Sequence, residues 1–547
     1  NQTQSWTNPM YPQWQGDDIT ANPGSNKQAC AALDAFASEG ANKGVTDAWN
    51  LHYSVIKAAN LIVNGAGNVN GSQEKKNVAF GNAHYWRAYS YFYLVRVFGK
   101  IPIITNTDIN QLDAQPAEIA EVYEMIVKDL KDAINELPTK YDYEPARLFD
   151  VDVWVTKQAA QSTLAAVYMS MAGYPLNKGT EYYKLAAEQA KDVIDNGFIL
   201  NPDWKDVYSM GNNYNKETLL GINNDAKGWW DHDSQLSSCC RFESLGDGGW
   251  GDAWGEIAFW KRYPEGPRKN AIYAKRITFQ DGTVITADCN WWDIPTADLW
   301  VPITMKTDAK ELEKQIKGLD EKIEKEKDSE KKTVRKVNGK YEKLLFEKGK
   351  KCVKEYHPMF TIFTVNCDEK GGMLRQPYDC MKPNYSGMVN DRRHNLIRYS
   401  EVLLWYAESA ARAGLDLREA KYYLKLVRQR AVNSADVDKV TLSDGSIVNI
   451  DNMNAAQLAE ACYIEHGWEV AGNWVSMVTR RADELRMNEL KKNFEYRVTN
   501  APVVIAKEGD KEYTAQESVT VTGPWSEDRI YCPYPTTDGE KNPNLKH

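Results

Sequence analysis

Residues 83–99 read AHYWRAYSYFYLVRVFG and continue directly into KIPIIT, and this stretch decides the fold. It has the character of an aromatic-rich helix that ends at a glycine, and Pro102 prevents its continuation. A second stretch of the same design, RYSEVLLWYAESAARAG, covers 398–414. Two such helices, about three hundred positions apart, indicate the two ends of one helical-repeat scaffold that frames a different middle region.

Apolar residues recur at helical spacing along both ends of the chain. In 118–137 they fall three or four positions apart and form one stripe. Small residues alternate with aromatic ones in 157–195 and 398–430, as in Ala186 and Tyr183, which is typical of tetratricopeptide (TPR)-like helical pairs. We therefore expect helices over 28–38, 45–64, 73–98, 118–137, 157–172, 181–195, 398–414 and 418–430, with a further helical block over 455–490.

The expected fold is mainly α, a TPR-like helical-pair scaffold with a large loop-rich, partly β middle region. We expect one domain over 1–547, made of N-terminal TPR-like helices (27–200), a loop-rich aromatic region (201–397), C-terminal TPR-like helices (398–490) and an irregular C-terminal tail (491–547). Within the middle region, 308–356 has the character of a charged helical insertion. Its helix, 308–332, has a short apolar seam and is expected to project, and a hairpin is expected around Asn338-Gly339. A partner-docking arm is the alternative interpretation.

Composition excludes several classes of function. The 547 residues carry a net charge of −9, which disfavours binding to a phosphate backbone and leaves neutral ligands open, so no nucleic-acid partner is expected. The sequence contains no run of about 18 apolar residues, so it predicts no membrane-spanning helix. The chain begins at Asn1 without an initiator Met or a signal peptide, so we expect its natural N-terminus to have been removed.

Catalytic and metal-binding signatures are sparse. No GxSxG, GxxxxGK[ST] or HExxH motif occurs, and GDGGWG (246–251) lacks the βαβ context of a nucleotide site. Nine cysteines show no zinc-ligand spacing, and the pair Cys239–Cys240 is interpreted as small buried thiols.

Two acidic groups remain as weak alternatives. Asp231-His232-Asp233 has metal-ligand chemistry but is better interpreted as a hydrogen-bonded loop. Glu465 and Glu469 stand one helical turn apart and could act on a glycoside, although a structural or solvated pair is favoured. We predict no catalytic residue, no metal and no cofactor.

Aromatic side chains are the strongest functional signal. The chain has 18 Trp and 30 Tyr, and tryptophans gather in loops of the middle region beside Gly and Asp. Adjacent tryptophans of an extended segment point to opposite sides, so at least one of each pair is a candidate for exposure. Exposed rings stack on the apolar face of a sugar while polar neighbours bind its hydroxyls. The predicted ligand-binding residues are Trp14, Asp17, Asp18, Trp229, Trp230, Trp250, Trp254, Trp291 and Trp292.

Four motifs in chain order resemble the SusD/RagB family. HYWRAYSYFYLVRVFGKIPIIT (84–105) is similar to a family helix that runs into Val-Arg-x-Phe-Gly, and 398–408 is similar to its Arg-Tyr-x-Glu-Val-Leu-Leu-x-Tyr-Ala-Glu helix. GDDITA (16–21) resembles the N-terminal acidic turn of the family, and 533–544 resembles its closing segment. One motif departs, because Asn473-Trp474-Val475-Ser476-Met477 lacks the Arg and Asp of the family's Arg-Trp-x-Asp-Leu and the ion pair they make. The insertion 308–356 is also outside the family pattern.

The resemblance implies a Bacteroidetes-type outer-membrane lipoprotein exposed at the cell surface and anchored by a lipidated cysteine upstream of Asn1. It implies a lid on a SusC-like TonB-dependent transporter that captures oligosaccharide for uptake. A lid that captures peptide or another nutrient is the alternative, and a glycosidase is a remote one. Because we expect an uncharged glycan, we also expect its affinity to respond little to salt.

Overall fold

The computed structural model describes residues 11–24, 28–65, 70–107, 113–209, 212–224, 236–240, 251–273, 276–279, 285–288, 332–337, 340–345, 357–363, 373–375 and 391–545. Within these ranges the fold is mainly α-helical, as the sequence predicts. None of the described helices combines the length and the apolar character that a bilayer crossing needs. The predicted helix 308–332, apart from Lys332 at the start of a strand, and the loop 231–233 lie outside the described residues.

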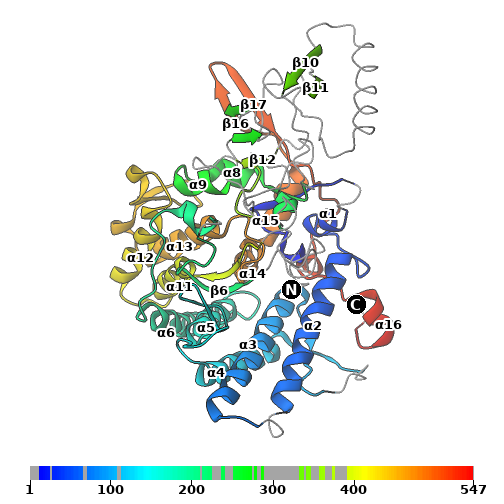
Figure 1. The fold of residues 1–547 in the computed structure, drawn as a ribbon, viewed down its shortest axis with the longest axis vertical. Coiled ribbons are helices and arrows are strands. Elements are labelled where there is room, and N and C mark those ends of the chain that lie inside the picture. Colours follow the sequence, from blue (N-terminus) through cyan, green and yellow to red (C-terminus); the bar gives the residue numbers. More distant parts are fainter. Residues whose placement is uncertain are drawn as a thin grey trace.

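The N-terminal part is a row of helices, each packed on its neighbour in sequence (Figure 1). The helices are α1 (Gln28–Asp34), α2 (Lys43–Asn64), α3 (Gln73–Phe98), α4 (Ile119–Glu136), α5 (Lys157–Ala172) and α6 (Thr180–Ile194). α3 packs on both α2 and α4, and it ends at Gly99, whose φ of 72° follows the expected glycine stop. Every side chain of α3 from Leu94 to Phe98 is buried, so the C-terminal end of this helix lies in the interior.

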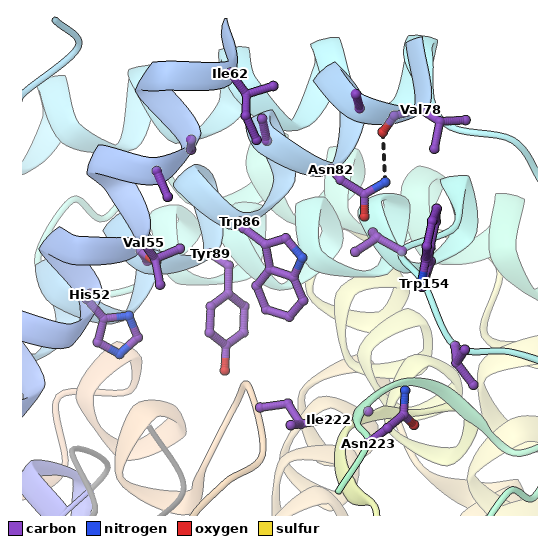
Figure 2. A pocket seen from close by; sticks show the side chains of 18 of the residues that line it. His52, Val55, Ile62, Val78, Asn82, Trp86, Tyr89, Trp154, Ile222 and Asn223 are labelled. Carbon is purple, nitrogen blue, oxygen red and sulfur yellow. Dashed lines mark hydrogen bonds between the residues drawn. The ribbon is translucent and has the colours of Figure 1, made fainter. Parts of the chain in front are cut away.

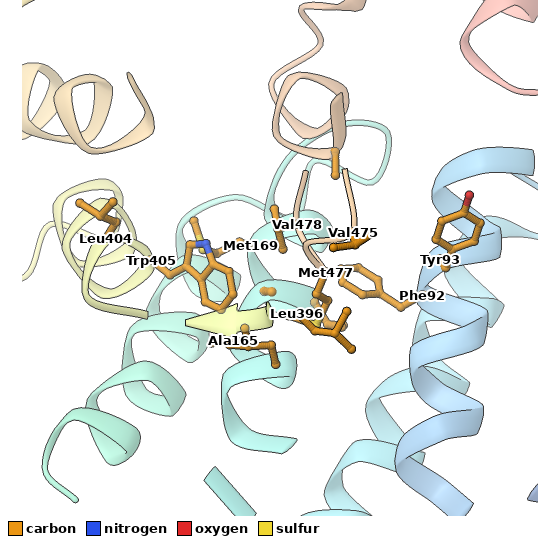
Figure 3. Packing of buried hydrophobic residues seen from close by; sticks show 14 of the residues in the cluster. Phe92, Tyr93, Ala165, Met169, Leu396, Leu404, Trp405, Val475, Met477 and Val478 are labelled. Carbon is orange, nitrogen blue, oxygen red and sulfur yellow. The ribbon is translucent and has the colours of Figure 1, made fainter. Parts of the chain in front are cut away.

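The C-terminal helices complete the same scaffold. They are α11 (Tyr399–Arg412), α12 (Leu417–Gln429), α13 (Ala455–Val470), α14 (Arg480–Arg486), α15 (Leu490–Thr499) and α16 (Thr536–Lys541). α11 packs on α6, α12 and α13, which confirms the predicted packing of 398–430 on the N-terminal pairs. Ala186 and Ala407 are fully buried, as close approach of paired helices requires. Figure 3 shows the shared core, where Phe92 of α3 and Trp405 of α11 lie among buried side chains that include Met477.

The middle region contributes short helices, and small two- or three-stranded sheets form there and in the N-terminal part. The helices are α7 (Leu236–Cys240), α8 (Ile257–Arg262) and α9 (Pro267–Ile272). The strand pairs are β1 (Ile19–Ala21) with β7 (Ala253–Gly255), β2 (Ile101–Pro102) with β3 (Pro116–Ala117), β4 (Arg147–Leu148) with β5 (Val151–Asp152), and β6 (Thr218–Ile222) with β13 (His394–Arg398). β8 (Arg276–Phe279) lies between β9 (Ile285–Asp288) and β12 (Met373–Arg375).

Three hairpins complete the strands: β10 (Lys332–Val337) with β11 (Lys340–Leu345), β14 (Lys439–Thr441) with β15 (Ile447–Asn449), and β16 (Val503–Glu508) with β17 (Lys511–Ala515). The first confirms the hairpin predicted around Asn338-Gly339, since Val337 pairs with Lys340. The third hairpin lies in 491–547 together with α16 and nearly all of α15, although we expected this tail to be irregular. Gly509, with a φ of 60°, allows the tight turn that joins its strands.

The predicted helical block 455–490 is divided. α13 ends at Val470 and α14 begins at Arg480, because Gly472 has a φ of 68° and the backbone leaves the helix there. The intervening segment carries the motif that departs from the family pattern. Trp474 is buried against Trp14 and Phe363, while the Ser476 Oγ donates to Glu401 Oε1 over 3.0 Å. Ser476, at the position of the Asp in the family motif, therefore makes a hydrogen bond to a carboxylate.

Two pairs of residues that the sequence analysis considered for chemistry, one of cysteines and one of glutamates, have structural roles. Cys239 and Cys240 are buried thiols, as interpreted from the sequence. The carboxylates of Glu465 and Glu469 are fully buried and paired with arginines, Arg268 bridging both. These glutamates are therefore part of an ion network inside the protein and are not exposed to a substrate.

Candidate functional site

A large pocket lies between the first two long helices and two segments that follow them in the chain. Its volume is about 1270 Å³. α2 and α3 form one wall with side chains spaced three or four positions apart, so they share one face of each helix. This wall contains His52, Val55, Ala58, Ala59, Ile62, Lys75, Val78, Ala79, Asn82, Ala83, Trp86, Tyr89 and Ser90. Figure 2 shows the Trp86 and Tyr89 rings between His52 on one side and Trp154 on the other.

The opposite wall is formed by Tyr143, the segment 153–155 after β5, and the segment 221–223 at the end of β6. Tyr143 and Trp154 form an aromatic cluster with Tyr141, with ring centroids 5.8–5.9 Å apart. Tyr141 is buried, whereas Tyr143 and Trp154 remain 42% and 37% exposed. Two large rings therefore stand at the rim of the pocket, accessible to a ligand.

Several residues that line this pocket have buried polar atoms without partners. Both ring nitrogens of His52, the Ser90 Oγ and the Asn223 Oδ1 are buried and have no hydrogen-bond partner in the described part of the chain. His52 stacks on Tyr93 at 4.2 Å and is 3% exposed. A buried polar group without a partner is costly, and most such groups in proteins are satisfied. These atoms are suited to bind a ligand that carries hydroxyl groups.

His52 is uncharged in this environment. Burial, and secondarily the positive charge of Arg96, lower the pKa of His52 to about 3. The neutral imidazole has one nitrogen that donates and one that accepts, as a hydroxyl partner requires. Among the described lining residues there is neither Asp nor Glu, so the pocket lacks the carboxylate pair of a glycosidase.

The predicted ligand residues near the N-terminus have partners inside the protein. Trp14 is fully buried and makes an edge-to-face contact with Trp474, at 5.7 Å. Trp254 lies in β7, pairs with Thr20 of β1, and stacks on His357 at 4.7 Å. The N-terminal turn and the middle region thus lie side by side, as expected, but these two rings contribute to packing.

Asp17 and Asp18 are buried and bonded as well. Asp17 pairs with Arg480 at 2.7 Å and with Arg262. Burial acts to raise its pKa, but the two arginines lower it below the usual range. Asp18 accepts from the backbone N–H of Gly472 over 2.7 Å, and burial raises its pKa to about 7. Both side chains connect the N-terminal turn to the segment around α14.

The other predicted tryptophans, Trp229, Trp230, Trp250, Trp291 and Trp292, lie outside the described residues. Their part in ligand binding stays a prediction. Trp229 and Trp230 follow Asn223 of the pocket by six and seven positions in the sequence.

The sequence analysis missed Trp86, Tyr89, Trp154 and His52. The first two belong to 83–99, which we interpreted as scaffold. A signal was present, since Asn82, Trp86 and Tyr89 share one face of α3 with Ser90. Polar residues within an otherwise aromatic helix face are unusual for a core and typical of a binding wall.

One group of potential metal ligands is already engaged. His84, Asp129 and Asp132 could place ligand atoms within 4.8 Å of one another. However, Arg87 binds both carboxylate oxygens of Asp129 at 2.7 Å, and His84 bonds to Glu136 at 2.7 Å. The group is explained by these ion pairs without a cation.

Two family models match this chain. One, described as starch-binding associating with outer membrane, matches residues 2–169. The other, described as the SusD family (SusD_RagB), matches residues 363–547. The first includes α2 and α3, and the second includes α11 to α16.

Curated relatives carry the same family name. A SusD-like protein of Bacteroides ovatus is 30% identical over 250 residues, which are 42% of this chain and 43% of the relative. SusD-like protein P2 of Formosa agariphila is 31% identical over 192 residues, 34% of this chain and 35% of the relative. The chain thus matches less than half the length of these relatives.

Solved structures share the fold over nearly the whole chain. A crystal structure with xylogluco-oligosaccharide is 20% identical and has a TM-score of 0.65, covering 99% of this chain and 97% of the other. A SusD-like carbohydrate binding protein from Bacteroides fragilis is 16% identical, with a TM-score of 0.66, and covers 100% and 94%. With both family models matched in order around a shared fold, this chain belongs to the SusD/RagB family.

Proposed function

We propose that this protein is a cell-surface glycan-binding protein whose oligosaccharide ligand occupies the pocket between α2, α3 and the segments 153–155 and 221–223. One observation carries the proposal: residues with accessible aromatic rings and residues with buried polar atoms that lack partners line the same cavity. A sugar ring has apolar faces for stacking and hydroxyls for hydrogen bonding, so it satisfies both at once.

In the proposed complex, Trp86 and Trp154 stack on sugar rings. The neutral His52 imidazole, the Ser90 hydroxyl and the Asn223 amide bind hydroxyls. The pocket volume of about 1270 Å³ is sufficient for several sugar units. Trp229 and Trp230, which follow Asn223 in the sequence, stay predicted ligand-binding residues.

We further propose that the protein delivers its ligand to a SusC-like TonB-dependent transporter and is held at the outer membrane by an N-terminal lipid. The family description, starch-binding associating with outer membrane, supports this location. A binding role without catalysis is supported by the carbohydrate-binding relatives and by the lining of the pocket, in whose described residues carboxylates are absent.

The proposal is tested by calorimetric titration with a panel of oligosaccharides, beginning with maltooligosaccharides and xylogluco-oligosaccharides. Trp86→Ala should weaken binding about five- to thirtyfold, since a stacking contact contributes about 1–2 kcal/mol. The matched control is Tyr422→Ala on α12, whose ring is 59% exposed and outside the pocket. If Trp86→Ala and Tyr422→Ala bind the oligosaccharide with equal affinity, the ligand site lies elsewhere.

Binding is separated from catalysis and from peptide capture in the same series. Prolonged incubation of the protein with each bound oligosaccharide should leave it uncleaved on product analysis. Titration with a mixed peptide library should give no heat that depends on Trp86. Cleavage, or peptide binding in place of glycan binding, would favour the glycosidase or peptide-lid alternative.

A further inference from the structure

Most buried arginines of the described chain are neutralised by a carboxylate. Arg87 pairs with Asp129 at 2.7 Å, Arg486 with Glu408 at 2.7 Å, and Arg497 with Glu256 at 2.7 Å. This is the usual arrangement, because a buried charge is costly unless it is paired. Two arginines close to the pocket, Arg393 and Arg96, differ from this arrangement.

Arg393 precedes β13 and is only 2% exposed. Its Nη2 donates to the backbone oxygen of Asp152 over 3.5 Å, and its guanidinium lies 5.7 Å from the ring of Tyr214. Its Nε and Nη1 have no hydrogen-bond partner in the described part of the chain. Burial lowers the pKa of Arg393 to about 10, opposed only by Tyr214, so no described carboxylate compensates its charge.

Arg393 contacts both segments of the pocket wall opposite α2 and α3. A Cβ at Gly221, which lines the pocket, would lie 2.7 Å from the Arg393 Nε, so the side chain runs over the space that this glycine leaves free. Its other contact, Asp152, is adjacent in sequence to Val153, which also lines the pocket. The guanidinium is thus located behind the wall at the Gly221 end, with its Nε and Nη1 buried and without a hydrogen-bond partner in the described chain.

A second uncompensated arginine is located near the His52 end. Arg96 is 4% exposed, lies over the ring of Phe92 at 3.7 Å, and has an Nη1 without a partner in the described chain. Its charge acts on His52, a lining residue, and burial lowers the pKa of Arg96 to about 10. Lys75 adds an exposed cation to the lining. One lysine of the lining and two buried arginines near it therefore carry positive charge at a pocket whose described lining has no carboxylate, in a chain of net charge −9.

We propose that the pocket selects acidic saccharides, with the carboxylate of a uronic acid or a sulfate ester neutralised by Arg393 at the Gly221 end. This inference rests on the proposed function and names the class of its ligand. It departs from our expectation of an uncharged glycan. An anion placed against Arg393 would supply the missing partner, and a site built to bind a charged group discriminates strongly against an analogue that lacks it. The stacking rings and hydroxyl-binding atoms favour a sugar as the carrier of that anion.

The test compares ligand pairs that differ only in charge. An oligogalacturonide is titrated against its methyl-esterified form, and a sulfated galactan oligosaccharide against its desulfated form. We expect the anionic member of at least one pair to bind about tenfold or more tightly. The first pair reports a carboxylate and the second a sulfate.

Two variants test whether Arg393 causes the preference for the anionic ligand. Arg393→Met should bring the affinity ratio within the preferred pair close to one without lowering the melting temperature, because it removes an unpaired buried charge. Arg393→Lys keeps the charge and should keep part of the ratio. A purely structural role for Arg393 would instead lower the melting temperature and weaken both members of the pair equally, which would contradict the proposal.

Comparing the anionic and neutral ligands on the unmodified protein tests the proposal even if a variant fails to fold. Neutral members that bind as tightly as their anionic partners in both pairs would overturn the acidic-saccharide proposal, while binding that depends on Trp86 would still support the glycan pocket. Binding of poly-glutamate without binding of either acidic sugar would also overturn it. Absence of Trp86-dependent binding to any glycan would contradict the proposed function itself.

Discussion

Arg398 and Glu469 form an ion pair inside the protein, with Nη1 and Oε1 2.7 Å apart and both side chains fully buried. The pair joins Arg398, the last residue of β13, to α13. Arg268 and Arg430 also bind Glu469, at 2.6 and 3.1 Å. Burial acts to raise the pKa of Glu469, but the three arginines together hold it well below its usual range. One carboxylate thus connects three separate parts of the scaffold.

Replacing this carboxylate should destabilise the protein strongly. Glu469→Gln leaves the buried arginines without their common charge partner, and breaking a buried ion pair costs about 3–5 kcal/mol. Asp47→Asn is the control, because the exposed pair of Lys43 and Asp47 contributes about 0.5 kcal/mol or less. Denaturant unfolding followed by circular dichroism measures both. Similar losses in the two variants would contradict a structural role for Glu469.

The pKa of Asp18 predicts a dependence of stability on pH. Burial raises this pKa from 3.8 to about 7, so between these values the folded chain holds a proton that the unfolded chain has released. Stability contributed by this group therefore falls as the pH rises from about 4 to 7. Asp18→Asn keeps an acceptor for Gly472 and removes the titration. It should raise the free energy of unfolding at pH 8 by more than about 1 kcal/mol, and identical pH profiles would refute the assignment.

Alanine substitutions at two glycines with the same backbone conformation can distinguish the cost of backbone strain from the cost of a steric clash. Gly414 and Gly472 have φ values of 69° and 68°, but a Cβ at Gly414 meets nothing within 4 Å, whereas one at Gly472 would lie 2.3 Å from the ring of Phe360. Gly414→Ala should cost about 1–2 kcal/mol for the left-handed backbone alone. Gly472→Ala should cost about 1–3 kcal/mol more through overpacking. Equal melting temperatures would show that the segment between α13 and α14 adapts freely.

The insertion should be dispensable for ligand binding. Figure 1 shows the β10–β11 hairpin and the helices α2 and α3 at opposite ends of the molecule. Deletion of 308–350 should therefore leave the affinity for a bound oligosaccharide within about twofold. The measurement is a titration of the deletion variant, with circular dichroism as the check on folding. Loss of binding in a folded variant would assign the insertion a part in the site.

The helical framework could be predicted because its signal is local. The apolar stripe of 118–137 and the small residues at Ala186 and Ala407 are visible without knowledge of the partner helix. The split of 455–490 was not predicted, since an isolated glycine is tolerated in a helix and only the ring of Phe360 shows why Gly472 is needed. The division of the chain at 200 and 398 stays a prediction.

The site was harder to predict, because exposure is a property of the assembled fold. Trp14 and Trp254 stand in loop-like sequence but are buried by Trp474 and His357, which are remote in the chain. Trp86 stands in a helix of the core and nevertheless faces a cavity. Composition indicated aromatic rings and polar neighbours as binding groups, but it could not distinguish a ring that packs from a ring that binds.

The most direct test is a crystal structure of this protein with an oligosaccharide that titration has shown to bind. The proposed function predicts sugar density in the pocket between α2 and α3, with one ring stacked on Trp86 or Trp154 and a hydroxyl within about 3 Å of His52. Density on another surface, with this pocket empty, would contradict it.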